Sequence, residues 1–458
     1  MKLAVVGAGY VGLTTSACLA ELGHSVTCVD SDASRIAILQ GGGVPIYEEG
    51  LHELMQKNRA AGRLTFSADL RPAAGHADAI FLAVGTPSRP DGDIDLSHIE
   101  TAARQLARDI RHDAVLIIKS TVVAGTARNL GRLVARERGG DAVSVASNPE
   151  FLREGTAIAD FMTADRIVAG ADDDLGADRL RRIYAPLRAR DIPYLEMSTA
   201  DAEMVKYAAN AFLALKLGFI NNVADLCEST GGDIRNVVSG IGLDRRIGPS
   251  FLSPGPGYGG SCFPKDTRAF AALGKRAGAR QWLVERLIED NEARKRKLAQ
   301  RIIDDMGKGG RPRRVAVLGL AFKSGTDDVR ESAALTIIPL LQASGAIVHA
   351  HDPRASRAAA EFLPGVRFSD DCYHACGDVD AAVVLTEWDE YRHLDLRRLA
   401  SVMRGRLLFD FRNILDPAEV SRHGFRYRPI GHSTGPFGKT AEGQGVADIY
   451  GRAAAYPV

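Results

Sequence analysis

The sequence is poor in the features that mark secreted, membrane-spanning and nucleic-acid-binding proteins. It has six cysteines in 458 residues, no apolar run of transmembrane length, and a formal net charge of only +1. So few cysteines exclude a disulfide-rich scaffold, and the missing apolar run excludes a transmembrane helix. The balanced charge disfavours a nucleic-acid surface. We therefore expect a cytoplasmic protein with reduced thiols, and neither nucleic acid nor membrane as a partner.

Cysteine and histidine side chains stand close together at Cys372, His374 and Cys376. A structural zinc site needs four ligands, which usually come as two closely spaced pairs. No second pair follows at a suitable spacing. We therefore interpret these residues as part of a surface turn and expect no metal.

The composition is that of an ordinary globular protein, with 45% hydrophobic and 25% charged residues. At this length we expect about three domains. The N-terminal region alternates short apolar runs with helical sequence, which predicts an α/β fold with a doubly wound parallel sheet. The expected strands are 3–7, 25–29, 79–84, 115–120 and 143–147.

The middle of the chain is helical. The spacing of apolar residues predicts one helix from Ser198 to Thr230, which at 1.5 Å per residue is about 48 Å long. A further helical segment covers 281–306. We expect this region to join two lobes and to form a dimer, as the central domain of three: 1–197, 198–306 and 307–458.

After a linker at 307–313 the first pattern returns in RRVAVLGLAF. Gly345 precedes Asp352 by seven residues, as Gly23 precedes Asp30. This repetition predicts a second Rossmann-like lobe. Of the glycine set it keeps only Gly319, so we do not expect it to hold a dinucleotide in the same way. We assign no role to the glycine-rich segment after Thr434.

The turn after the first expected strand reads GAGYVG and supplies Gly7, Gly9 and Gly12, with Asp30 eighteen residues after the last glycine. In this context the glycines let backbone approach a pyrophosphate at a helix N-terminus, and the acid accepts hydrogen bonds from a ribose diol. An acid at this point favours NAD over NADP, although nearby Arg35 weakens that argument. The alternative is a plain tight turn.

A second motif, GPGYGGSCFPKD, places Cys262 in a glycine-dense loop. A single cysteine is usually a buried core residue, but buried cysteines rarely sit in such loops. We therefore interpret Cys262 as a nucleophile, with Lys265 close enough to favour its thiolate.

Two further motifs carry polar groups to the expected site. Lys206 and Asn210 share one helix face at i,i+4 spacing and can donate to an oxyanion, unless they simply face solvent. Glu150 and Glu154 follow a strand, where ligands bind in open α/β sheets; the alternative is that they stabilise a helix N-terminus. Thr121 follows the neighbouring strand.

Together these segments resemble the UDP-glucose/GDP-mannose dehydrogenase family over nearly the whole chain. The shared motifs are GAGYVG, VGTP, KSTVVAGT, NPEFLREG, DAEMVKYAANAFLALK, GYGGSCFPKD, GLAFKSGTDDVRES and FDFRN. The resemblance implies NAD as cofactor, UDP-glucose as substrate, and a homodimer or a dimer of dimers. It implies that Cys262 captures an aldehyde, becomes a thioester on the second oxidation, and is released by water.

The resemblance also implies roles for individual residues. Implied catalytic residues are Cys262, Lys206, Asn210, Asp266, Glu150, Glu154 and Thr121. Implied cofactor-binding residues are Gly7, Gly9, Tyr10, Val11, Gly12, Asp30, Arg35, Thr86, Thr121, Glu154, Lys265 and Arg330. Implied substrate-binding residues are Glu150, Phe151, Leu152, Arg153, Glu154, Lys206, Asn210, Arg246, Phe251, Leu252, Ser253, Pro254, Gly255, Tyr258, Gly259, Lys323 and Arg412, with Arg246 reaching across the dimer.

Three alternatives stay open. The substrate is a different nucleotide sugar, such as GDP-mannose or an N-acetylhexosamine nucleotide. The protein is a two-electron hydroxyacid dehydrogenase, which would make one NADH per substrate and tolerate loss of Cys262. Or it is an NAD-sensing scaffold without turnover.

Overall fold

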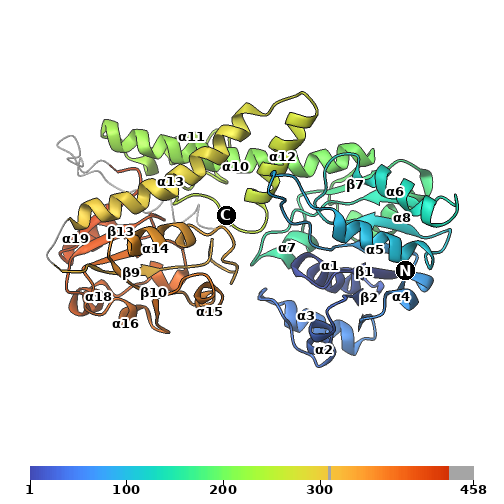
Figure 1. Ribbon diagram of the computed structural model, residues 1–458, viewed down its shortest axis with the longest axis horizontal. Coiled ribbons are helices and arrows are strands. Elements are labelled where there is room, and N and C mark those ends of the chain that lie inside the picture. Colours follow the sequence, from blue (N-terminus) through green and yellow to red (C-terminus); the bar gives the residue numbers. More distant parts are fainter. Residues whose placement is uncertain (308–310, 433–458) are drawn as a thin grey trace. The chain divides into compact units, whose positions relative to one another are not determined.

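The computed structural model describes residues 1–307 and 311–432 and divides the chain into two compact units (Figure 1). The first unit comprises 1–210 and 268–281, and the second comprises 211–267 and 282 onward. Helices α10 (Thr199–Thr230) and α12 (Phe263–Arg276) each contribute residues to both units. The three-domain division stays a prediction, and its last part includes 308–310 and 433–458, which lie outside the described residues.

An eight-stranded sheet forms the centre of the first unit, in the order β3-β2-β1-β4-β5-β6-β7-β8. Every neighbouring pair is parallel except β6 and β7, which are antiparallel. The five strands that the sequence predicted all belong to the parallel part of the sheet. The strands are β1 (Lys2–Val6), β2 (Ser25–Val29), β3 (Leu64–Ser67), β4 (Ala79–Leu82), β5 (Val115–Ile118), β6 (Ser144–Ser147), β7 (Ile167–Ala171) and β8 (Tyr194–Met197).

Helices cover both faces of this sheet. Along β1, Leu3 and Val5 belong to one apolar core while Ala4 and Val6 belong to another. Because neighbouring strand residues point to opposite faces, two cores mean two covered faces. The helices are α1 (Tyr10–Glu21), α2 (Ala33–Gln40), α3 (Leu51–Ala60), α4 (Leu70–His76), α5 (Ser97–Ala107), α6 (Thr126–Glu137), α7 (Ala157–Met162), α8 (Asp174–Ile183) and α9 (Ala185–Arg188).

The second unit repeats this plan with a six-stranded, fully parallel sheet in the order β11-β10-β9-β12-β13-β14. This is the order of the first six strands of the other sheet, and it confirms the second Rossmann-like lobe that the repeated sequence pattern predicted. Val315 and Val317 of β9 face one core, and Ala316 and Leu318 the other. The strands are β9 (Arg314–Leu318), β10 (Ile347–His351), β11 (Arg367–Phe368), β12 (Ala381–Val384), β13 (Leu407–Asp410) and β14 (Arg426–Pro429).

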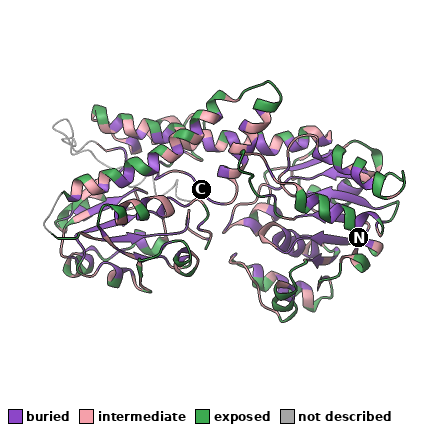
Figure 2. Ribbon diagram, viewed as in Figure 1, coloured by how far each residue is buried: buried purple, intermediate pink, exposed green. Residues whose placement is uncertain are grey.

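The remaining helices belong to the central and C-terminal segments. They are α11 (Ile234–Gly242), α13 (Trp282–Met306), α14 (Ala334–Ala343), α15 (Ser356–Ala360), α16 (Cys372–Ala375), α17 (Asp389–Arg392), α18 (Leu396–Val402) and α19 (Pro417–Arg422). In each unit the central strands are almost entirely buried, whereas the edge strands β3, β8, β11 and β14 are partly exposed (Figure 2). The fold is therefore the expected α/β architecture of two Rossmann-like lobes with a long central helix.

The cysteine pair near the second sheet is not on the surface. Cys372 and Cys376 are buried in the apolar core that also contains residues of β9 and β12, while His374 is exposed. The interpretation of these residues as a surface turn is wrong for both thiols, because they fill core space. Within 1–307 and 311–432, no group of three or more His, Cys, Asp or Glu side chains is placed to hold a metal ion.

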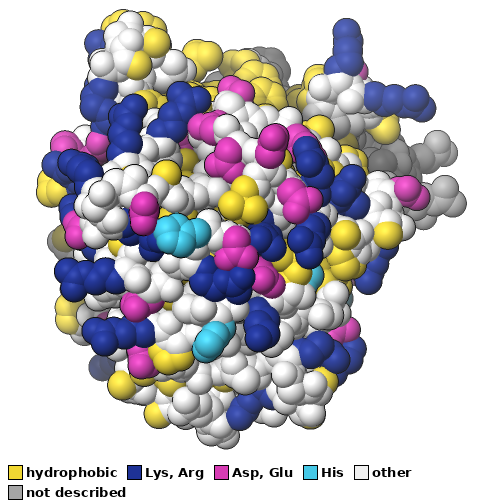
Figure 3. Space-filling view, turned by 90° about the vertical axis from the view of Figure 1, so that its right-hand side faces the viewer, with side chains coloured by type: hydrophobic (Ala, Val, Ile, Leu, Met, Phe, Trp, Pro, Cys, Tyr) yellow, Lys and Arg dark blue, Asp and Glu magenta, His cyan; other side chains and the backbone are white. Residues whose placement is uncertain are grey.

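No helix in the described part of the chain combines the length and the apolar character that crossing a membrane requires. The face of the molecule drawn in Figure 3 carries lysine and arginine interspersed with aspartate and glutamate. Charges of both signs are thus mixed on this face, as the composition predicted.

Candidate active site

The turn between β1 and α1 is built by its glycines. Gly7 has a φ of +106°, and a Cβ on Gly12 would lie 1.8 Å from the Gly7 carbonyl oxygen, so neither position accepts a side chain. Gly9, by contrast, has nothing within 4 Å of where its Cβ would lie. It precedes α1, whose first N–H groups receive no side-chain cap from it. This open helix N-terminus fits a pyrophosphate.

Asp30 directly follows β2, as the dinucleotide motif predicted. Its carboxylate accepts hydrogen bonds from the backbone N–H of Ala8 (2.6 Å) and of Asp32 (2.9 Å). The Arg35 guanidinium lies 3.3 Å from the same carboxylate. Asp30 thus links the second strand to the glycine turn and pairs with Arg35, whose predicted contact with the cofactor stays a prediction.

The matching acid of the second lobe is occupied differently. Asp352 is buried and accepts hydrogen bonds from the N–H groups of Leu320, Ala321, Arg354 and Ala355 and from the Trp388 indole. Asp352 accepts these five hydrogen bonds and is buried, whereas Asp30 accepts two from backbone N–H groups and is only half-buried, so the Asp352 carboxylate serves as a brace for the turn after β9. This supports the expectation that the second lobe does not hold a dinucleotide as the first one does.

Tyr10 connects the glycine turn to the acidic loop after β6. Its hydroxyl donates to the buried Glu48 carboxylate, which also accepts the N–H groups of Gly155 (2.6 Å) and Ala157 (2.7 Å). Burial beside Glu48 raises the Tyr10 pKa far above its usual value. Val11, the next residue, is half-buried in α1. Glu48 was not predicted, because it lies in a loop with no motif of its own.

Thr86 and Thr121 lie together beyond the ends of β4 and β5. The Thr86 hydroxyl donates to the Thr121 carbonyl oxygen at 2.9 Å. Ser120 donates to the Val84 carbonyl oxygen at 2.6 Å and fixes the same two segments. The carboxyl ends of parallel strands are where open α/β sheets bind ligands, so both threonines are at the expected edge.

Glu150 and Lys206 form a buried ion pair, with Lys206 Nζ 3.0 Å from Glu150 Oε1 and the two side chains only 5% and 4% exposed. The other Glu150 oxygen accepts the Leu152 N–H at 2.7 Å. Burial opposes ionisation of Glu150, but the charge of Lys206, the Leu152 hydrogen bond and the charge of Lys119 outweigh it and lower its pKa. Glu150 is therefore a carboxylate at neutral pH, able to accept a proton.

The rest of the acidic loop surrounds this pair. Lys206 Nζ lies 5.3 Å from the centre of the Phe151 ring. The Arg166 guanidinium stacks on the same ring, with its central carbon 3.6 Å from the ring centre. Arg153 pairs with Asp160 at 2.6 Å. Glu154 is buried, and Asn210 is buried one turn after Lys206 on α10. The first unit thus brings the predicted carboxylates and Lys206 together.

The second unit carries the cysteine loop. Gly257 has a φ of +121°, and a Cβ on Gly259 would lie 2.5 Å from the Glu331 carbonyl oxygen, so the loop depends on glycine at both positions. Cys262 directly precedes α12, and its carbonyl oxygen accepts the Asp266 N–H at 2.8 Å. The Ser261 hydroxyl lies 3.5 Å from Cys262 Sγ. The thiol is partly exposed, unlike the other five.

Side chains from two helices hold the backbone of this loop. Asn221 of α10 accepts the Gly255 N–H at 2.9 Å, and Arg294 of α13 donates to the Gly255 carbonyl oxygen at 2.6 Å. Asn291 binds both the N–H and the carbonyl oxygen of Tyr258, at 2.8 and 3.1 Å. None of the three was predicted. The sequence did contain a signal for them: each is a polar residue on the apolar face of an expected helix, where a polar side chain needs a buried partner.

Aromatic contacts complete the loop. The ring of Phe263 lies 5.9 Å from that of Phe251 and 6.3 Å from that of Tyr258. Phe251 has a φ of +61°, a conformation that non-glycine residues rarely adopt. Leu252 and Pro254 are buried, and Ser253 is exposed. The predicted substrate segment is therefore a well-packed loop.

Several predicted cationic residues already have carboxylate partners. Lys265 pairs with the fully buried Asp266 next to it. Arg330 pairs with Asp328 at 2.8 Å. Arg246 pairs with Asp244, and its side chain is 89% exposed, which leaves it accessible for the predicted contact across a dimer.

Arg412 is held firmly beside the glycine loop. Its Nε donates to the Leu385 carbonyl oxygen and its Nη2 to the Phe322 carbonyl oxygen, both at 2.7 Å. A Cβ on Gly255 would lie 3.2 Å from Arg412 Nη1. Lys323 follows Phe322 and is half-buried. Arg412 thus keeps one terminal nitrogen at the loop in which substrate contacts were predicted.

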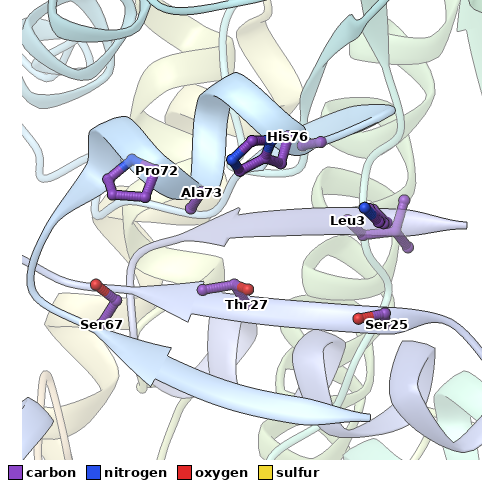
Figure 4. A pocket seen from close by; sticks show the side chains of 9 residues that line it. Leu3, Ser25, Thr27, Ser67, Pro72, Ala73 and His76 are labelled. Carbon is purple, nitrogen blue, oxygen red and sulfur yellow. The ribbon is translucent and has the colours of Figure 1, made fainter.

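One cavity of about 210 Å³ lies elsewhere in the first unit, between α4 and strands β1 to β3. Figure 4 shows its lining, which includes Ser25, Thr27, Ser67, Pro72 and His76. None of these was predicted as a site residue. We therefore locate the candidate site from the strand ends and loops instead.

The predicted residues fall into two sets, one in each compact unit. The first unit holds the glycine turn, Asp30, the threonines, the acidic loop, Lys206 and Asn210. The second holds the loop of Cys262, Asp266, Lys323, Arg330 and Arg412. A Rossmann-type lobe with an open glycine turn and an acid after its second strand defines a NAD-binding dehydrogenase.

Comparison with known proteins makes the class more specific. The chain belongs to the UDP-glucose/GDP-mannose dehydrogenase family. Its NAD binding domain matches residues 1–188, its central domain 200–293 and its UDP binding domain 316–417.

The relatives cover nearly the whole chain. A UDP-glucose 6-dehydrogenase of Rhizobium meliloti is 45% identical over 94% of this chain and 99% of its own length. A UDP-glucose dehydrogenase structure from Pyrobaculum islandicum has a TM-score of 0.87 at 40% identity, covering 94% of this chain and 98% of that one. A UDP-D-ManNAc dehydrogenase structure from Pyrococcus horikoshii has a TM-score of 0.83 at 26% identity, covering 96% and 100%.

Proposed function

We propose that this protein oxidises UDP-glucose to UDP-glucuronate in two steps, with two NAD and one water per sugar. The observation that carries the proposal is Cys262, a partly exposed thiol directly before α12 in a chain 45% identical to a UDP-glucose 6-dehydrogenase. Helix N-termini favour anions such as a thiolate. An alcohol dehydrogenase that stops at the aldehyde has no use for a nucleophilic thiol.

The cofactor would be held by the first lobe. The N-terminus of α1 would bind the pyrophosphate, Asp30 the ribose hydroxyls, and Thr86 and Thr121 would lie beyond the strand ends. When bound, NAD would accept the hydride in each oxidation. The other implied cofactor contacts, including Lys265 and Arg330, stay predictions.

The chain's own residues would manage the carbonyl chemistry. The first oxidation removes a hydride and the hydroxyl proton from C6 and leaves an aldehyde. Cys262 would add to this aldehyde to give a thiohemiacetal, whose oxidation leaves a thioester. Lys206 and Asn210 would donate hydrogen bonds to the oxyanion as each tetrahedral species forms.

Hydrolysis would complete the reaction. Glu150, ionised beside Lys206, would take a proton from the attacking water, with Asp266 and Thr121 in proton relay. The C–S bond then breaks, which releases the carboxylate and returns the thiol. Arg412, Lys323 and the segment from Phe251 to Gly259 would bind the nucleotide sugar.

We also propose a dimer built on α10. Phe212, Phe219 and Leu226 are 60 to 64% exposed and recur every seven residues, which places them on one helix face. Exposed apolar stripes of this kind mark protein interfaces. A cytoplasmic location stays a prediction.

The stoichiometry of NADH tests the proposed reaction directly. We expect two NADH for each UDP-glucose consumed, followed by absorbance at 340 nm with limiting sugar nucleotide. One NADH would favour a two-electron dehydrogenase instead. A parallel panel of GDP-mannose and UDP-N-acetylhexosamines would reveal a different substrate, and no NADH with any of them would favour a scaffold.

A further inference from the structure

Lys119 is a buried cation whose direct hydrogen-bond and ring contacts are all neutral. It follows β5, is 4% exposed, and forms no ion pair with any residue of 1–307 or 311–432. Its ammonium donates to Asn148 Oδ1 at 3.0 Å and to the Tyr184 hydroxyl at 3.5 Å. It also lies 5.7 and 6.0 Å from the centres of the Phe161 and Tyr184 rings. A buried charge without a carboxylate partner lowers stability, so its presence calls for another explanation.

The partner of Lys119 positions Glu150. Asn148 lies two residues before Glu150, where the chain leaves β6. Its side chain accepts from Lys119 and Tyr184 and donates to the Val168 carbonyl oxygen of β7 at 2.8 Å. Asn148 thus makes three buried hydrogen bonds, and the donor of one of them is the charged ammonium of Lys119. The start of the acidic loop is thereby fixed to both neighbouring strands.

Lys119 also acts on Glu150 through its charge. Glu150 is faced by Lys206 from α10 and by Lys119 from the end of β5, and both charges favour its ionised form. Burial lowers the pKa of Lys119 to about 8; the Glu150 charge opposes this shift, Lys206 adds to it, and Cys18 of α1 opposes it. One carboxylate is therefore shared by two buried lysines, of which only Lys206 touches it.

We propose that Lys119 is a positioning residue for Glu150: it anchors Asn148 at the end of β6 and supplies a second positive charge that holds Glu150 in its ionised form. The role of Glu150 in hydrolysis rests on the proposed function, but the effect of Lys119 on its ionisation does not. Lys119 itself need not touch the substrate.

The test measures the ionisation of Glu150 in the full-length protein. Infrared difference spectra between each protein and its Glu150→Gln version, with ¹³C-labelled glutamate, follow this carboxylate across pH. In Lys119→Met we expect its midpoint to move to higher pH by about one unit. Lys119→Arg keeps the charge and should return the midpoint toward the parental value. The acid limb of the kcat profile with UDP-glucose should move in parallel.

Arg179→Met is the matched control. Arg179 is another buried cation of the same lobe, and it donates to the Asp113 carbonyl oxygen before the opposite end of β5. This variant should leave the Glu150 midpoint in place. An unmoved midpoint in folded Lys119→Met, or an equal shift in Arg179→Met, overturns the proposal.

Activity and ionisation separate the two proposals. If the parental protein does not oxidise UDP-glucose while the infrared midpoint still moves, the proposed function fails and the role of Lys119 stands. If two NADH form per sugar and the midpoint does not move, the proposed function stands and the role of Lys119 fails.

Discussion

Charged side chains that are removed from water dominate the candidate site at the scale of single residues. Glu150 and Lys206 are both almost fully buried, and the Lys206 ammonium, 3.0 Å away, helps to lower the pKa of the Glu150 carboxyl. Removing one partner of such a pair leaves an uncompensated buried charge, which is strongly destabilising. Substitutions of these residues should therefore use neutral side chains of the same shape where possible. A truncated side chain would lower both stability and activity, and the two effects could not be separated.

Cys262→Ser should separate the two oxidations. Serine can still add to the aldehyde, but an oxygen ester is hydrolysed more slowly than a thioester, so we expect steady-state turnover to fall at least ~100-fold. NAD affinity should stay within about twofold, because the cofactor-binding residues are unchanged.

Intact-protein mass spectrometry with UDP-glucose and NAD should then find sugar nucleotide attached to the Cys262→Ser protein. Parental turnover in this variant, or turnover in Cys262→Ala, would contradict covalent catalysis.

Glu203 predicts a pH dependence of stability. Its carboxylate caps α6 by accepting the N–H groups of Gly125 (2.6 Å) and Ala127 (2.8 Å). Burial, opposed by these hydrogen bonds, raises its pKa to about 7. A raised folded-state pKa means that the folded protein binds the proton more tightly, so stability falls as pH rises from the unfolded-state value toward 7.

Glu203→Gln removes this titration. We expect the free energy of unfolding of the parental protein to fall relative to that of the variant by about 3 kcal/mol between pH 4.5 and 7. Chemical denaturation across this range measures the difference. Parallel pH profiles for the two proteins would show that Glu203 does not titrate there.

Two glycines of one turn have different tasks at the scale of elements. Gly12 packs α1 against the Gly7 carbonyl, whereas Gly9 borders open space at the helix N-terminus. The same chemical change, glycine to alanine, should therefore act on folding at one position and on binding at the other.

Gly9→Ala should keep the free energy of unfolding within about 0.5 kcal/mol while weakening NAD at least ~10-fold, because the methyl group enters the space of the pyrophosphate. Gly12→Ala should destabilise the lobe by several kcal/mol, since its Cβ overlaps backbone. Thermal unfolding and calorimetric titration with NAD distinguish the two. Equal effects of both variants on stability would contradict this division.

Helix α10 combines several tasks along its 32 residues. Lys206 and Asn210 are one turn apart, and Asn221 follows eleven residues later, close to three full turns. The helix thus carries the two proposed oxyanion donors and a side chain that holds the glycine loop, while Phe212, Phe219 and Leu226 lie on an exposed face.

The two sheets repeat one strand order, but we expect a dinucleotide only at the glycine turn of the first lobe. The second lobe keeps Gly319 and Asp352 as packing elements, with Asp352 saturated by backbone N–H groups. A shared scaffold therefore does not imply a shared ligand, because function depends on which polar groups are left available.

The exposed stripe on α10 predicts the assembly. Phe212→Glu combined with Phe219→Glu should convert a dimer into a monomer in sedimentation velocity runs at micromolar concentration, because two charges would be buried at the interface. Phe362→Glu is the matched control, since Phe362 is 58% exposed on the second lobe and outside the stripe. Dissociation by the control, or a persistent dimer in the double variant, would place the interface elsewhere.

Local sequence predicted much of the fold, because strand, turn and helix signals are contained within short windows. The dinucleotide turn, Asp30 and the helix ending at Thr230 were confirmed within a residue or two. The antiparallel β7 and the edge strands β3 and β8 were missed, because they lie outside the motifs. The burial of Cys372 and Cys376 was also misjudged. The short helix α16 directs both thiols into the core and leaves His374, between them in the sequence, exposed.

By itself the sequence determined which chemical groups the protein contains and in what local setting: a dinucleotide turn with its acid, a thiol in a glycine loop, and paired polar residues on a helix. Each of these depends on spacing of a few residues. Only the tertiary structure decided which groups support them. Asn291 and Arg294 hold a loop more than 30 residues away, and Lys119 and Asn148, 29 residues apart, meet at neighbouring strand ends. Such contacts depend on strand order and helix packing, which no local pattern encodes.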